Sequence, residues 1–173
     1  MTLHGSQAVD LLRGNGTGKR AAMASADLHI PYRGGFVGPE HRFALTVYFE
    51  DTDTAGVVYY ANYLKFMERA RSDMIRAVGV DQGEALRADG SAYYVAEVAI
   101  KYRKPARLGD DLLVLSTVEA VRAASVDIHQ RVMRGQEVLT DARVTAAFLD
   151  RDGRPQRQPK DWVERFNMIM SGK

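Results

Sequence analysis

One long amphipathic helix, set among strand-like segments, constrains most strongly what this chain can fold into. Between Tyr60 and Val78, apolar side chains recur at steps of three and four residues, the period of one helix face, and Gly79 supplies a stop signal. The apolar positions are Tyr60, Tyr63, Leu64, Met67, Ala70, Met74, Ile75 and Val78. Because this stripe is the longest of its kind in the chain, we expect a sheet to cover it.

Segments with the two-residue alternation of β-strands lie on both sides of this helix. One precedes it at residues 43–49, and four follow it, at 92–102, 112–121, 126–132 and 138–149. The connections between the last four are too short for helical crossovers, so adjacent members should pair antiparallel. A short amphipathic helix is expected around residues 161–170. The predicted fold class is therefore α+β, with an antiparallel five-stranded sheet around one long central helix.

The first 40 residues differ from the rest, because they are rich in Gly, Ala and Ser and show no sustained period. We predict a flexible N-terminal extension over residues 1–40 and one folded domain over residues 41–173. The run Gly14–Lys19 superficially suggests a phosphate loop but lacks the required glycine and Gly-Lys-Ser/Thr spacing. Met23 is a second candidate start of translation.

Composition excludes several classes of function. The chain has 173 residues, enough for one domain, and 24 basic against 22 acidic residues, a balance that does not indicate a nucleic-acid partner. Cysteine is absent and the four histidines are scattered, so we predict no disulfide, no metal site and no cofactor. No apolar run approaches the roughly 18 residues of a membrane span. We expect a cytoplasmic protein.

An acidic turn (residues 50–56) joins the first strand to the long helix and is the best candidate for a functional site. It holds Glu50, Asp51 and Asp53, followed by Gly56. An Asp-x-Asp turn commonly does no more than make local hydrogen bonds or cap a helix. The residues alone therefore leave both a structural and a chemical role open.

Three sequence blocks carry a resemblance to a known family. The first is Tyr48-x-Glu50-Asp51-Thr52-Asp53-x-x-Gly56-Val57-Val58-Tyr59-x-x-x-Tyr63, followed by Phe66-Met67-Glu68-Arg69-Ala70-Arg71. The others are Val98-x-Ile100-x-Tyr102-x-x-Pro105-Ala106-Arg107-Leu108-Gly109-Asp110 and Arg122-Ala123-Ala124-Ser125. Over about residues 42–150 the chain resembles the 4-hydroxybenzoyl-CoA thioesterase family of hotdog-fold proteins, and most closely its branch of acyl-CoA thioesterases associated with the Tol-Pal system.

This resemblance implies a fold, an assembly and a site. The fold would be a hotdog, an antiparallel sheet wrapped around the long helix, with two copies pairing by sheet extension into a dimer and dimers often joining into a homotetramer. The acyl-CoA site would lie between subunits. The catalytic acid would be Asp53, as nucleophile or general base. The Tyr60 backbone N–H would stabilise the thioester oxyanion at the helix N-terminus, with Gly56 allowing close backbone approach, and Arg122 and Ser125 would bind coenzyme A.

The expected function is hydrolysis of a short-chain or aromatic acyl-CoA to free acid and coenzyme A. Tyr60 stands where the Tol-Pal branch often has histidine and the 4-hydroxybenzoyl branch has tyrosine, so the substrate stays open. A hydratase of the same fold is a weaker alternative, because none of the histidines lies in the motif. The other alternative is a non-catalytic acyl-thioester-binding or adaptor module of a membrane-associated complex. Arg103, Lys104 and Arg107 are further candidates to contact the phosphates of coenzyme A.

Overall fold

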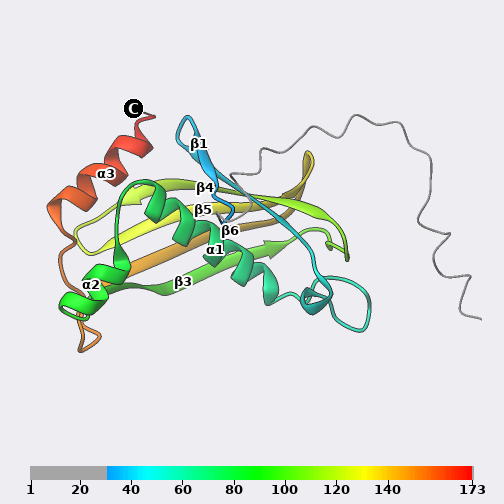
Figure 1. The fold of residues 1–173 in the computed structure, drawn as a ribbon, viewed down its shortest axis with the longest axis horizontal. Coiled ribbons are helices and arrows are strands. Elements are labelled where there is room, and N and C mark those ends of the chain that lie inside the picture. The colour runs from blue at the N-terminus through cyan, green and yellow to red at the C-terminus, as the bar shows by residue number, and fades with distance from the viewer. Residues whose placement is uncertain (1–30, 173) are drawn as a thin grey trace, which may run out of the picture. The chain divides into compact units, whose positions relative to one another are not determined.

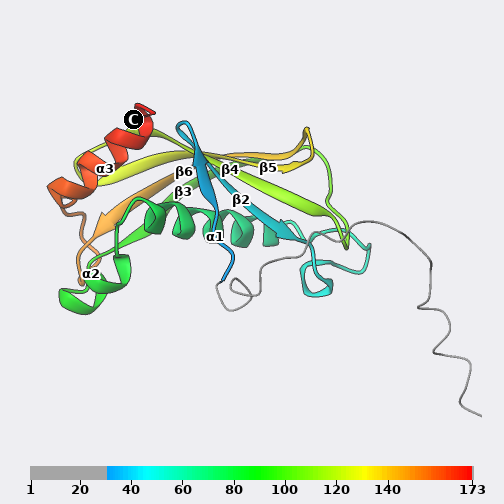
Figure 2. The same ribbon diagram turned by 45° about the horizontal axis from the view of Figure 1, so that its top comes forward.

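A computed structural model of the chain describes residues 31–172, and Figures 1 and 2 show their arrangement. The elements follow the order predicted from periodicity, with one short strand added at the start. The short helix after the long one lies where the sequence offered a helical connection, around residues 82–88. They are β1 (Gly35–Val37), β2 (Glu40–Thr46), a 3-10 turn (Phe49–Asp51), α1 (Asn62–Ala77), α2 (Gln82–Ala88), β3 (Ala92–Tyr102), β4 (Asp111–Val121), β5 (Ser125–Arg134), β6 (Glu137–Leu149) and α3 (Lys160–Met170).

The strands form one antiparallel sheet in the order β1-β2-β4-β5-β6-β3. The described residues thus contribute six strands rather than the predicted five, the additional one being β1. The expectation that adjacent strands of the last four would pair holds for β4, β5 and β6 but is wrong for β3 and β4. Strand β3 pairs with β6 instead, with Val98 opposite Val144, and leaves its other edge free. Its mostly exposed side chains fit this edge position, whereas β4 to β6 alternate between buried and half-buried residues.

Helix α1 lies along one face of the sheet, as both ribbon views show (Figures 1 and 2). The side chains of Phe66, Met67, Ala70 and Met74 are fully buried beneath it. They form the core together with residues of the sheet, among them Val114, Val118, Ile128, Val132 and Leu139. A sheet wrapped around a single long helix is the hotdog fold, so the predicted fold is confirmed.

The helix differs from its predicted pattern at two kinds of position. Tyr60 is 60% exposed, because the helix begins only at Asn62 and the tyrosine precedes the core-facing stripe. Arg71 and Asp73, by contrast, are polar but buried. Periodicity counts apolar residues and cannot detect polar side chains that find partners in the interior.

The sheet begins earlier than the predicted domain boundary at residue 41. Of residues 35–40, which were assigned to the flexible extension, 35–37 form β1, 38–39 form a turn and Glu40 begins β2. The Gly34 N–H donates to Asp73 Oδ2 at 2.8 Å, and a Cβ on Gly34 would lie 2.4 Å from the Arg42 carbonyl oxygen, so this strand can lie close to its neighbour only with glycine there. Residues 1–30, with the Gly14–Lys19 run and Met23, lie outside the described residues.

Helix α3 lies where the short C-terminal helix was expected. Its Trp162 and Phe166 are buried in a cluster with Met74 of α1 and Phe148 of β6. The helix thereby closes the end of the core that the β4–β5 hairpin approaches (Figure 1). Between residues 31 and 172, no helix is long and apolar enough to cross a membrane.

Candidate active site

The acidic turn folds back on itself as a small hairpin. The Tyr59 N–H donates to the Asp51 carbonyl at 2.9 Å, Thr52 bridges Val58, and the Asp53 N–H donates to the Val57 carbonyl at 2.9 Å. Asp53 therefore lies next to the tip of the hairpin. The other end of the hairpin leads directly into α1.

The two aspartates of the turn have different environments. Asp51 is 6% exposed; its Oδ2 accepts the Tyr48 N–H at 2.9 Å, and its carbonyl oxygen accepts the Asn62 side-chain amide at 2.9 Å. Asp53 is exposed, and its Oδ1 accepts the Ala55 N–H at 2.8 Å. Within residues 31–172, no donor contacts Asp53 Oδ2. Asp51 thus holds the turn together, while Asp53 offers a carboxylate oxygen to solvent or a ligand.

The backbone conformation at position 56 requires a glycine. Its φ is +72°, in the left-handed region that side chains disfavour, and its N–H closes the turn by donating to the Asp53 carbonyl at 3.0 Å. Within residues 31–172, no atom lies within 4 Å of the position of a Gly56 Cβ. The close approach expected at Gly56 therefore involves no other described part of this chain, and approach by a substrate stays a prediction.

The start of α1 presents unpaired backbone donors. The Tyr59 carbonyl accepts the Asn62 N–H at 2.8 Å, whereas the N–H groups of Tyr60 and Ala61 have no acceptor among the described residues. The Tyr60 carbonyl oxygen, by contrast, is paired: it accepts a hydrogen bond from the Tyr102 hydroxyl at 3.2 Å. Free N–H groups at the positive end of a helix dipole can hold a developing oxyanion.

A pocket of about 280 Å³ adjoins these donors. Its walls are mostly aromatic and apolar, with two cations; they are Val58, Tyr60, Tyr63, Tyr102, Arg103, Lys104 and Pro105. The Tyr102 ring lies edge-on to the Tyr60 and Tyr63 rings, with centroids 6.1 and 5.8 Å apart. Such a wall suits an apolar acyl group beside a polar reaction centre.

Two tyrosines of this pocket, Tyr63 and Tyr102, are held by hydrogen bonds and have raised pKa values. Tyr63 Oη accepts the Ala106 N–H at 2.8 Å, and burial raises the pKa of Tyr63. Burial, with a smaller contribution from Tyr60, also raises the pKa of Tyr102. Sequence reasoning treated Tyr63 as packing and Tyr102 as one side chain of a strand face. The signal for Tyr102 was its position at the end of β3, just before Pro105, where strand residues can reach a site.

The cations beside the pocket are already engaged with acids. Arg103 Nη2 lies 3.3 Å from Asp141 Oδ2, and Lys104 forms an ion pair with Glu137. Both side chains are more than half exposed. They remain able to exchange these carboxylates for a phosphate, because exposed ion pairs are weak.

The structure does not bring Arg122 and Ser125 to Asp53 within one chain. They lie in the β4–β5 hairpin, where the Arg122 N–H donates to the Ser125 carbonyl at 2.8 Å and Arg122 Nη1 lies 2.5 Å from Asp127 Oδ2. The acidic turn follows β2, whose last residue Thr46 pairs with Asp111 at the opposite end of β4. An 11-residue strand spans about 36 Å.

Comparison with known proteins places this geometry in a family. The model of the thioesterase-like superfamily matches residues 47–166. The acyl-CoA thioesterase YbgC of Haemophilus influenzae is 41% identical over 108 residues, 62% of this chain and 79% of that protein. The acyl-CoA thioester hydrolase YbgC of Escherichia coli O6:H1 is 36% identical over 127 residues, 72% of this chain and 94% of that protein. A crystal structure of a probable thioesterase from Bartonella henselae matches with a TM-score of 0.67 and 30% identity, over 69% of this chain and 99% of that one.

These relatives confirm the family that the three sequence blocks indicated, including its acyl-CoA thioesterase branch. The matched region contains the acidic turn, α1 and all three blocks. The chain belongs to the thioesterase-like superfamily of hotdog proteins.

Proposed function

We propose that this chain is an acyl-CoA thioesterase, which hydrolyses a short-chain or aromatic acyl-CoA to the free acid and coenzyme A. The observation that carries the proposal is one loop that holds both halves of the chemistry. The Asp53 carboxylate is exposed at the hairpin, and the same loop ends in the unpaired N–H groups of Tyr60 and Ala61 beside an aromatic pocket.

The reaction needs a group that delivers oxygen and a group that stabilises the oxyanion. Asp53 either draws a proton from water, which attacks the thioester carbon, or attacks that carbon itself to form a mixed anhydride that water then hydrolyses. In both routes the carbon–sulfur bond breaks and coenzyme A leaves as a thiolate that takes up a proton. The Tyr60 N–H donates to the carbonyl oxygen while negative charge develops there, a contribution on the order of 3 kcal/mol.

Assembly into a dimer would complete the coenzyme A site. The free edge of β3 exposes Tyr94 and Val95, which suits pairing with a second copy. Two β3 edges related by a twofold axis run antiparallel, so the Tyr102 end of one would lie towards the Ala92 end of the other. That end of the sheet carries the β4–β5 hairpin. Arg122 and Ser125 of a second copy would thus contact the nucleotide, and dimers would join into a homotetramer in the cytoplasm.

A hydratase of the same fold is less well supported. His41 is completely buried and His129 lies in the middle of β5; of the two histidines in the described part of the chain, neither lines the pocket beside Tyr60. A dehydration or hydration step would need a base other than these histidines.

The test is thiol release from a panel of short-chain, long-chain and aromatic acyl-CoAs, with the oligomeric state measured in parallel. We expect turnover by wild type and its loss in Asp53→Asn at the same oligomeric state. If wild type binds acyl-CoA but releases no thiol from any member of the panel, the hydrolase proposal is wrong and a binding module takes its place.

A further inference from the structure

A second site with ligand-binding character lies further along α1, around Arg71. This side chain is 9% exposed, so it is one of the few charged groups inside the described part of the protein. Its Nη1 donates to Gln130 Oε1 at 2.8 Å. Gln130, itself fully buried, is held by donating to the Met67 carbonyl at 3.1 Å and to Ser116 Oγ at 2.8 Å. The guanidinium is therefore fixed in position by a side chain that cannot turn away.

Arg71 has no carboxylate partner among residues 31–172, although arginines nearer the surface do. Arg131 lies 3.0 Å from Glu40, and Arg134 lies 2.7 Å from Asp110. Burial lowers the pKa of Arg71, and the nearby Glu68 carboxylate offsets only part of this lowering. A largely buried cation without a counter-ion is unfavourable, because the charge has lost much of its hydration. Such a group is typically retained where something else neutralises it.

The unused N–H groups of Arg71 face a cavity. A guanidinium has five N–H donors, and here a single hydrogen bond occupies one of them. In the described residues, the completely buried side-chain atoms without a partner are His41 Nδ1 and Thr140 Oγ1, and no Arg71 nitrogen is among them. Nε and Nη2 of Arg71 are therefore not completely buried. Arg71 lines a cavity of about 140 Å³, which we call the Arg71 cavity, and we take this to be the space that its unused N–H groups reach.

The walls of the Arg71 cavity are apolar apart from a few groups on the helices. Side chains of the sheet and α1 form the apolar part: Ile75, Tyr93, Tyr94, Val95, Ile128 and Ala146. The polar part comes from Glu68, Ser72 and Gln82. Glu68 is exposed and its Oε1 accepts Ser72 Oγ at 2.6 Å, so this acid has a partner other than Arg71.

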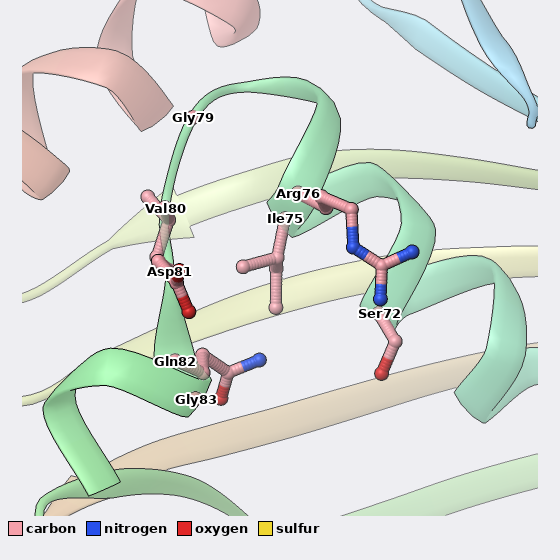
Figure 3. Close-up of a pocket in the computed structure, with 8 residues that line it drawn as sticks. All are labelled: Ser72, Ile75, Arg76, Gly79, Val80, Asp81, Gln82 and Gly83. Atoms are coloured by element: carbon pink, nitrogen blue, oxygen red, sulfur yellow. The ribbon is translucent and has the colours of Figure 1, made fainter. Parts of the chain in front are cut away.

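A larger pocket of about 490 Å³ adjoins the cavity, because Ser72, Ile75 and Gln82 line both. Figure 3 shows this outer pocket between the second half of α1 and the start of α2, with the polar ends of Ser72, Arg76 and Gln82 around it. Arg76 is exposed there, and Asp81 caps α2 by accepting the Glu84 N–H at 2.9 Å. A small ligand can therefore approach Arg71 from this side.

We infer that the Arg71 cavity binds a carboxylate with a short apolar body. A planar carboxylate matches the fork of a guanidinium and can accept two of its N–H groups, while the cavity walls suit carbon rather than a fully charged phosphate. Within one chain the site lies apart from the start of the helix, since Arg71 lies about 14 Å along the helix from Asn62 at 1.5 Å per residue. Tyr94 and Val95 of the β3 edge line the cavity, so the proposed dimer would place it near the subunit interface. Binding of a free acid does not rest on the proposed function, whereas a role in binding the substrate does.

Binding of benzoate and butyrate to the full chain tests the site, by calorimetry and by NMR shifts. Three proteins are compared: wild type, Arg71→Met and Arg69→Met. Arg69 is the matched control, an exposed arginine on the same helix that lines no pocket described here. We expect saturable binding by wild type and Arg69→Met, and at least tenfold weaker binding by Arg71→Met. Equal binding by all three proteins, or no saturable binding by wild type, overturns the inference.

A second measurement needs no variant and covers the case in which Arg71→Met does not fold. Benzamide has the shape of benzoate without its charge. Wild type should bind benzamide at least tenfold more weakly than benzoate, because the neutral amide cannot neutralise the guanidinium. Equal affinity for the two molecules overturns the assignment of a carboxylate site.

The carboxylate has two possible sources, which kinetics with acyl-CoA substrates separates. If it is the distal end of a dicarboxylic thioester substrate, Arg71→Met raises the KM of that substrate at least tenfold and leaves the KM of a neutral thioester of equal length unchanged. If it is a free acid such as the reaction product, benzoate changes kcat for the neutral thioester in wild type and not in Arg71→Met.

Discussion

The two halves of α1 use polar groups in opposite ways. At its start, the exposed Asp53 carboxylate and the N–H groups of Tyr60 and Ala61 have unused hydrogen-bonding capacity directed at solvent. In its second half, Asp73 is buried and its Oδ2 accepts from the Gly34 N–H and lies 3.1 Å from His41 Nε2, which attaches the first strands to the helix. The exposed groups before the first turn of the helix are thus free to react, whereas Asp73 holds the fold. Substitution of Asp53 should change rate, and substitution in the Asp73–His41 contact should change stability.

The largest effect is expected for Asp53→Asn. The amide is neither a base nor a nucleophile, so kcat/KM should fall by roughly 10²- to 10⁴-fold with little change in the melting temperature. Thiol release and thermal melts measure the two quantities. Glu50→Gln is the matched control, because Glu50 is an exposed acid in the same turn, and it should keep wild-type activity. A similar loss in both variants would mean that the charge of the turn, and not Asp53, matters.

Gly56→Ala tests how far the backbone conformation of the acidic turn contributes to stability. The alanine would be forced to a positive φ, and the free energy of unfolding should fall by about 1 to 2 kcal/mol. Denaturant titration measures this change. Gly35→Ala is the control, because neither Gly35 nor Gly56 has an atom within 4 Å of its Cβ position but only Gly56 has a positive φ. Equal changes in the two variants would contradict the conformational explanation.

Tyr102→Phe removes the hydroxyl that donates to the Tyr60 carbonyl while it keeps the ring in the pocket. Losing this one hydrogen bond should lower kcat by up to about tenfold, because it holds the Tyr60–Ala61 peptide, which adjoins the peptide that carries the Tyr60 N–H. KM and the melting temperature should change little. A rise in KM with kcat unchanged would show that Tyr102 only binds substrate.

The smallest effect is a pH dependence of stability that arises in the second half of α1. Burial lowers the pKa of His41 below its ordinary 6.5, although Asp73 opposes the shift. The unfolded chain therefore binds a proton at higher pH than the folded one, and stability should decrease as pH falls below about 6.5, by at most about 1.4 kcal/mol per pH unit.

Melting curves between pH 7 and 5 check this expectation, and His41→Gln should flatten the slope. His129→Gln is the control, since His129 lies on the sheet with 25% of its side chain exposed and should leave the slope unchanged. A slope that persists in His41→Gln would assign the pH dependence to other groups. Activity in the same range should not follow the slope of stability, because the reacting groups lie at the other end of the helix.

The sequence by itself determined the element types and the candidate loop. The three- and four-residue spacing of α1 and the alternation of the strands reflect which side chains must leave water, and that requirement is local. The Asp53–Tyr60 loop was identified because its residues are contiguous. The left-handed turn that joins them depends on Gly56, which is visible in the sequence.

Only the tertiary structure decided the strand order, the exposure of Tyr60 and the polar partners of the interior. Strand β3 lies at the sheet edge beside β6, its partner from a distant part of the chain. Tyr102 reaches Tyr60 through a hydrogen bond between residues 42 positions apart. Arg71 joins Gln130 across 59 positions, and the sheet holds Arg122 away from Asp53 within one chain. Local patterns do not encode such pairings, because the free energy that selects them comes from packing the whole chain at once.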